Sequence, residues 1–128
     1  MNETQMQQAL EQKNYQFRGQ LEQLQDDQLA IKKEQRYVEE QQEAFFQLQQ
    51  KEQAAYNFVL NNCESGERSF LQERGDDSLY LAKKAQQEFE EQLLQLEKEK
   101  HSLNDQEDQL NNEQRAFWKA QEEGTNGT

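Results

Sequence analysis

Two side chains in this sequence could do chemistry beyond that of carboxylates, and the first is His101, the single histidine of the 128-residue chain. An imidazole acts as a general base or a metal ligand only with a second group placed beside it. His101 is a lone histidine beside Lys100 and Glu99 on a predicted helix, and the chain has no phosphate-binding loop, zinc-ligand spacing or nucleophile–base motif. We therefore expect a solvated His101, no catalytic residue, no metal, no cofactor and no enzymatic activity.

The second such side chain is Cys63, the single cysteine, so no disulfide can form within the chain. We expect a free structural thiol, and an intermolecular disulfide is the alternative. One unpaired cysteine fits a reducing compartment. We therefore expect a cytoplasmic protein, and the sequence leaves open whether it is exported together with a partner.

The chain is acidic, with 26 Asp and Glu against 14 Lys and Arg and a formal net charge of −12. This charge repels phosphate backbones, so nucleic acid is not an expected partner. No apolar run approaches the roughly 20 residues that a membrane-spanning helix needs. The N-terminal residues have neither the basic start nor the apolar segment of a secretory signal. The expected partners are therefore proteins.

The composition favours helices over sheets. Hydrophobic residues make up 32% of the chain, which contains 25 glutamines and no proline. The β-branched residues typical of strands are few: Thr4, Ile31, Val38, Val59, Thr125 and Thr128. Gln, Glu, Leu, Lys and Ala dominate instead, and all are good helix formers.

Apolar residues recur every seven positions and form what we call the apolar column. Its members are Leu10, Phe17, Leu24, Ile31, Val38, Phe45 and Val59 in the first half, and Ala82, Phe89, Leu96, Leu103, Leu110 and Phe117 in the second. Glu52 interrupts the first series. A sustained seven-residue repeat predicts coiled-coil helices.

Four residues after each apolar position lies a second series, the polar column. In the first half it contains Gln28, Gln35, Gln42 and Gln49. A buried glutamine must find hydrogen-bond partners, so this column weakens a two-helix seam. One interpretation is that these glutamines lie at the wet edge of the helix pair. The other is that they face further helices in a larger bundle.

The two halves are predicted to fold back on each other, as an all-α, elongated, antiparallel two-helix hairpin forming a single domain. Capping and glycine signals place a helix at about residues 4–64, a loop at about 65–76, a second helix at about 77–122 and a frayed tail at 123–128. Matching the apolar columns places Val59 beside Ala82 and Phe45 opposite Leu96. The predicted hairpin seam is Leu24, Ile31, Val38, Phe45, Val59, Ala82, Phe89, Leu96, Leu103, Leu110 and Phe117.

Several apolar residues lie outside this seam, and two helices cannot bury all of them. Such exposed apolar positions commonly mark interaction surfaces. The predicted partner interface comprises Phe46, Leu48, Phe58, Leu94 and Trp118, together with the polar-column residues Gln28, Gln35, Gln42 and Gln49.

The second half resembles a known family through the runs Gly75-Asp76-Asp77, Gln86-Gln87-Glu88-Phe89, Leu96-Glu97-Lys98-Glu99-Lys100 and Glu113-Gln114-Arg115. These runs are similar to small helical-hairpin accessory proteins encoded beside LXG-domain toxins of bacterial type VII secretion systems. The resemblance implies a non-enzymatic targeting partner or chaperone. Such a protein binds the helical N-terminal domain of the toxin, together with a second small helical protein, and promotes its secretion.

The sequence departs from the related WXG-type hairpins in two places. Trp118 is followed by Lys119-Ala120 rather than by a glycine two positions on, and no Phe- or Tyr-x-x-x-Asp/Glu export signal is present. The export signal would then lie on a partner. The competing hypotheses are a self-associating structural coiled coil, which as an isolated chain would form a homodimer, and a prefoldin-like holdase. The holdase is the weakest, because prefoldin-like chains need strands at the bend.

Overall fold

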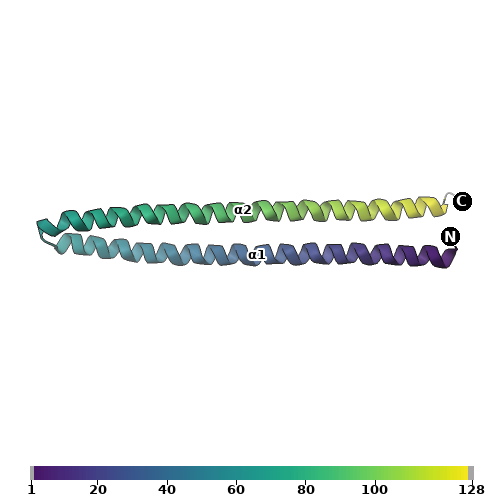
Figure 1. Ribbon diagram of the computed structural model, residues 1–128, viewed down its shortest axis with the longest axis horizontal. Helices are drawn as coiled ribbons and strands as arrows, with labels where there is room; N and C mark the ends of the chain where they lie inside the picture. Colours follow the sequence, from purple (N-terminus) through teal and green to yellow (C-terminus); the bar gives the residue numbers. More distant parts are fainter. Residues whose placement is uncertain (1, 127–128) are drawn as a thin grey trace. The chain divides into compact units, whose positions relative to one another are not determined.

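The computed structural model describes residues 2–126 of the chain, with side chains up to residue 124. Two α-helices account for nearly all of this part: α1 (Glu3–Asn62) and α2 (Ser65–Asn126), labelled in Figure 1. Residues 2–126 include no strand. The two helices pack against each other, which confirms the prediction of an all-α two-helix hairpin.

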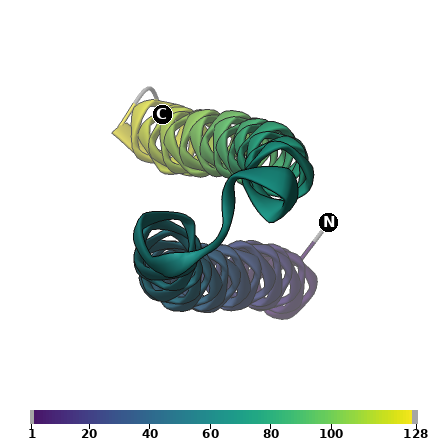
Figure 2. The same cartoon turned by 90° about the vertical axis from the view of Figure 1, so that its left-hand side faces the viewer.

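The bend between the helices is much shorter than predicted, and it consists of Cys63 and Glu64 alone (Figure 2). The segment at about 65–77, expected to be a loop, forms the first turns of α2. Gly66 and Gly75 do not end a helix, since no glycine among the described residues has a positive φ. The prediction failed because it relied on glycines and polar residues as breakers, which tertiary packing overrides.

Side chains and carbonyl groups at the bend supply the caps that glycine would otherwise provide. The Glu64 carbonyl accepts hydrogen bonds from the backbone N–H groups of Glu67 at 3.1 Å and Arg68 at 3.2 Å, which begins α2. Arg68 Nη2 in turn donates to the Leu60 carbonyl at 3.2 Å, near the C-terminal end of α1. Asn62 Nδ2 donates to the Phe58 carbonyl at 2.7 Å. The bond from Arg68 satisfies one of the carbonyl groups that the C-terminal end of α1 leaves unpaired.

The chain divides into two compact units, which are described separately. The terminal unit comprises residues 1–32 and 97–128. In it, the rings of Phe17 and Phe117 meet edge to face, with centroids 5.9 Å apart. The ammonium group of Lys13 lies 5.0 Å from the Phe17 centroid and 5.9 Å from that of Phe117. Gln28 Nε2 donates to Asn104 Oδ1 at 3.0 Å, so α1 and α2 run antiparallel here.

The bend unit comprises residues 33–96. The rings of Phe45 and Phe89 lie 5.8 Å apart between their centroids. Nearer the bend, Gly75 is buried against the Tyr56 ring; a Cβ atom added to the glycine would lie 3.8 Å from the Cγ atom of that ring. Val38 and Ala82 are also buried. These contacts show the same antiparallel pairing within the bend unit.

The register differs from the predicted one by seven to eleven residues of α2 at the contacts across the hairpin. Phe45 contacts Phe89, seven residues before Leu96, the residue expected opposite it. The cause is the short bend, because a hairpin that turns at Cys63 and Glu64 pairs α1 with earlier residues of α2 than a loop at 65–77 would. Tyr56, at a polar-column position, lies beside Gly75, seven residues before Ala82, whereas the ring contacts Phe45–Phe89 and Phe17–Phe117 join residues of the two apolar columns.

Most of the predicted seam is buried or half-buried, and Val59 is the exception. Phe17, Val38, Ala82 and Leu110 are the buried hydrophobic residues of the described chain. Val59 is 42% exposed, whereas its neighbour Leu60 is half-buried. The placement of Val59 in the seam was therefore wrong, because the buried face of α1 shifts by one residue near the bend.

The shift occurs where the heptad repeat is interrupted in both helices. The less exposed positions in α1 run 45, 49, 53, 56 and 60, with two successive steps of four. In α2, Ala85 and Gln86 are both less exposed, and the positions 78, 82, 85, 86, 89 and 93 again contain two successive steps of four, around either Ala82 or Phe89. Such an insertion locally unwinds a coiled coil. Gln49 is the central residue of the interruption in α1, and Ala82 lies within the stretch 78–93 that contains the one in α2.

Candidate protein interface

The exposed apolar side chains concentrate in the bend unit. Thirteen large hydrophobic residues are exposed within the described chain, and ten of them lie between residues 33 and 96. These ten are Tyr37, Phe46, Leu48, Phe58, Val59, Phe70, Leu79, Tyr80, Leu81 and Leu94. The two units have similar lengths, so the bend unit contains the better candidate for a protein-binding surface.

Four of the five predicted off-seam interface residues are exposed. The exposed fractions are 49% for Phe46, 65% for Leu48, 70% for Phe58 and 58% for Leu94. Trp118 differs, because it is half-buried and its ring meets that of Phe117 edge to face at 5.3 Å. Part of the Trp118 surface is thus covered within the hairpin itself.

The polar-column glutamines lie in the hairpin seam. Gln28, Gln35, Gln42 and Gln49 are all half-buried, and Gln28 bonds across the hairpin to Asn104. Half-burial in the seam agrees with the interpretation that these glutamines lie at the wet edge of the helix pair. Gln42 and Gln49 nevertheless also line an open groove, so both can reach a third helix.

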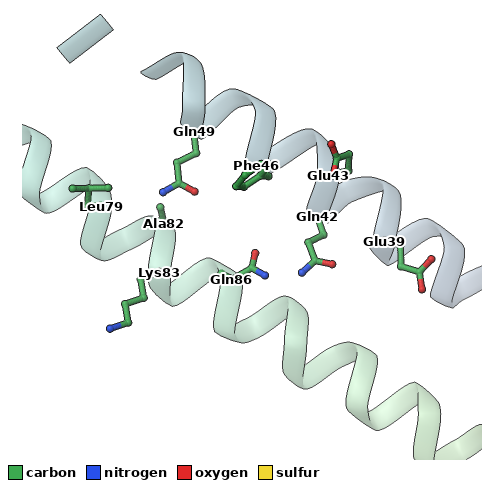
Figure 3. Close-up of a pocket in the computed structure, with 9 residues that line it drawn as sticks. All are labelled: Glu39, Gln42, Glu43, Phe46, Gln49, Leu79, Ala82, Lys83 and Gln86. Atoms are coloured by element: carbon green, nitrogen blue, oxygen red, sulfur yellow. The ribbon is translucent and has the colours of Figure 1, made fainter. Parts of the chain in front are cut away.

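The first groove lies between α1 and α2 in the bend unit (Figure 3). It is lined by Glu39, Gln42, Glu43, Phe46, Gln49, Leu79, Ala82, Lys83 and Gln86. Its apolar part consists of Phe46, Leu79 and Ala82. In Figure 3, Gln42 and Gln49 extend from α1 towards α2, and Gln86 extends from α2 towards α1. The groove is therefore apolar at its centre and has amides along its length.

A second groove in the same unit contains Leu48 and Leu81 as its exposed apolar residues. Tyr56 and Ala85 also line it, and Ser78 Oγ donates a hydrogen bond to Glu52 Oε1 at 2.8 Å within it. Phe46 and Leu48 are two positions apart, about 200° around an α-helix, so they project to different sides of α1. One bound helix cannot cover both grooves.

Charged residues border the first groove. Glu39 and Glu43 belong to α1, and Lys83 belongs to α2. Among the described residues, Glu39 and Lys83 form no hydrogen bond or ion pair, while Glu43 accepts one hydrogen bond from Gln47 Nε2 at 3.3 Å. Lys83 therefore pairs with neither glutamate within the hairpin.

The residues first considered for chemistry do not come together. His101 is exposed on α2, and Cys63 is half-buried at the bend, where its thiol donates to the Leu60 carbonyl at 3.5 Å. Within residues 2–126, no three His, Cys, Asp or Glu side chains are grouped closely enough to hold a metal ion. None of the described helices has an apolar stretch long enough to cross a membrane.

Sequence reasoning missed part of this surface. Phe70 lay in the segment expected to be a loop, and Tyr80 and Leu81 lay just after it. Because the bend was mispredicted, the predicted register did not bring Leu81 near Leu48, although both line the second groove. The available signal was the break of the apolar column at Glu52, which marks the interruption that both grooves adjoin.

Comparison of the chain with models of protein families, with curated proteins and with solved structures finds no match.

Proposed function

We propose that this protein is a non-enzymatic adaptor or chaperone that binds long helices of a partner protein through its bend unit. The partner proposed is the helical N-terminal domain of an LXG-type toxin, bound together with a second small helical protein. Binding would cover apolar helix surface on the toxin and promote its type VII secretion. The resemblance of the second half of the chain to accessory proteins of such toxins supports the choice of partner.

The observation that supports binding most strongly is the exposed apolar surface of the bend unit. Ten large hydrophobic residues are exposed there, and exposed apolar surface beyond scattered single residues is common at interaction sites. Two grooves adjoin it, and they share Gln49 and Ala82. One groove for each of two partner helices agrees with a complex that contains a toxin and a second small protein.

Self-association is the alternative function. The same exposed residues could pack against a second copy of the chain and form a structural four-helix assembly. The net charge of −12 opposes this, since two copies bring like charges together. A partner with basic residues beside its apolar stripe meets no such repulsion.

The test is to mix the purified chain with the helical N-terminal domain of an LXG-type toxin encoded in the same genome. Size-exclusion chromatography with light scattering measures the mass of each species. The proposed function predicts a heterocomplex that replaces the free chain. A chain that remains a homo-oligomer beside unbound toxin domain would instead support the scaffold function.

A further inference from the structure

The first groove differs from a merely apolar patch because its two sides have opposite charge. Its α1 side has Glu39 and Glu43, one helical turn apart, and its α2 side has Lys83. The apolar residues Phe46, Leu79 and Ala82 lie between them. A helix lying in the groove would place its apolar stripe on these three residues and its two flanks against the two charged sides.

We propose that the first groove binds an amphipathic helix of a partner protein whose flank of basic residues faces α1 and whose flank of acidic residues faces α2. This inference deepens the proposed function and rests on it for the identity of the protein that contains the helix. Glu39 and Lys83 have no partner among the described residues, so a bound helix can pair with them without breaking an existing bond.

The charge pattern fixes the direction of the bound helix. Turning a helix end for end, with its apolar stripe still against the groove, exchanges its two flanks. For a given partner helix, only one direction therefore places basic residues beside Glu39 and Glu43 and acidic residues beside Lys83. Charged flanks set helix orientation in coiled coils in the same way.

The probe is a synthetic three-heptad helical peptide with leucine along one stripe, lysine along one flank and glutamate along the other. A fluorescent acceptor is attached to its N-terminus, and a donor is attached to Cys63 at the bend of the full-length chain. Binding is measured by titration, and the direction of the bound peptide by energy transfer. A peptide with glutamate on both flanks is the control.

We expect the mixed-flank peptide to bind more tightly than the all-glutamate control. The variant Lys83→Glu should weaken binding two- to fivefold, because a rim charge pair is replaced by repulsion. The triple variant Glu39→Lys, Glu43→Lys, Lys83→Glu exchanges the two sides. It should restore the affinity and reverse the peptide, which changes the energy transfer from high to low or from low to high.

Unchanged energy transfer in the triple variant, or equal affinity for the two peptides, would overturn the inference. Equal affinity of the wild type and of Phe46→Ala for the mixed-flank peptide would also overturn it, because loss of a central aromatic contact should cost roughly tenfold or more. If the peptide binds as expected and the toxin domain does not, the groove assignment holds and the proposed function fails. If the toxin domain binds and the peptide does not, the proposed function holds and the groove assignment fails.

Discussion

Gln49 of α1 and Ala82 of α2 line both grooves of the bend unit. Gln49 is also the middle residue of two successive four-residue steps in the burial pattern of α1, and Ala82 lies within the stretch 78–93 where the repeat of α2 is interrupted. The grooves therefore adjoin the level at which the heptad repeat is interrupted. Local unwinding and the small side chain of Ala82 leave this part of the seam open, and the exposed apolar residues Phe46, Leu48, Leu79 and Leu81 line the two grooves.

The register can be tested with pairs of cysteines in a Cys63→Ser background. Phe45→Cys with Phe89→Cys should crosslink within one chain through a short bifunctional maleimide, because the two rings are in contact. Phe45→Cys with Leu96→Cys is the control, displaced by a further heptad, or about 10 Å along the helix. Mass spectrometry of digested monomer identifies the products. Efficient crosslinking of the control pair alone would contradict the observed register.

The shifted seam near the bend can be tested with two adjacent residues. Leu60→Ala should lower the free energy of unfolding by about 1–2 kcal/mol, because Leu60 is half-buried in the seam. Val59→Ala should change it by no more than about 0.5 kcal/mol, because Val59 is exposed. Urea unfolding followed by circular dichroism measures both. A larger loss of stability for Val59→Ala than for Leu60→Ala would show instead that the heptad face continues unbroken through Val59.

The side-chain amide of Gln53 lowers the stability of the hairpin. Its Nε2 atom is buried and has no hydrogen-bond partner in the described structure. Gln53→Leu should therefore raise the free energy of unfolding by about 1–2 kcal/mol, since it removes an unsatisfied donor and keeps similar bulk. The matched control is Gln50→Leu, on the exposed side of the same helix, with an expected change within about 0.5 kcal/mol. Destabilisation by Gln53→Leu would show that the amide has a partner.

Two helical glycines should be replaceable by alanine with a gain in stability. A Cβ atom at Gly19 meets no atom within 4 Å, and one at Gly75 meets the Tyr56 ring at 3.8 Å, an ordinary contact. Each change should raise the free energy of unfolding by about 0.5–1 kcal/mol through helix propensity. Thermal unfolding measures the gain. A loss confined to Gly75→Ala would mean that Tyr56 packs more closely than the structure shows.

The sequence predicted the helices more reliably than their connection. The seven-residue spacing from Leu10 to Phe45 and from Ala82 to Phe117 was sufficient to predict two paired helices, because only an α-helix places such residues on one face. The bend was mispredicted because Gly66 and Gly75 are turn formers in isolation. In the folded chain Gly75 packs against Tyr56 instead, a contact between distant residues that local propensity does not encode.

The candidate interface was predictable only in part, for the same reason. Phe46, Leu48, Phe58 and Leu94 fall outside the heptad columns, and this alone predicts their exposure. Phe46 and Leu79 line one groove, and Leu48 and Leu81 line the other. Which residues of α1 and α2 share a groove depends on the register, and hence on the two-residue bend. With a register error of seven to eleven residues, the predicted hairpin does not bring together the residues that line either groove.

The most direct test of the central claim, that partner helices bind the bend unit, compares two double variants in their affinity for the toxin's helical N-terminal domain. Phe46→Glu with Leu48→Glu alters exposed residues of the bend unit, and Tyr15→Glu with Leu29→Glu alters exposed residues of the terminal unit by the same charge. Isothermal titration calorimetry should show at least roughly thirtyfold weaker binding for the bend-unit pair, and a change below about threefold for the terminal-unit pair. Equal losses for the two pairs, or a larger loss for the terminal-unit pair, would contradict the claim.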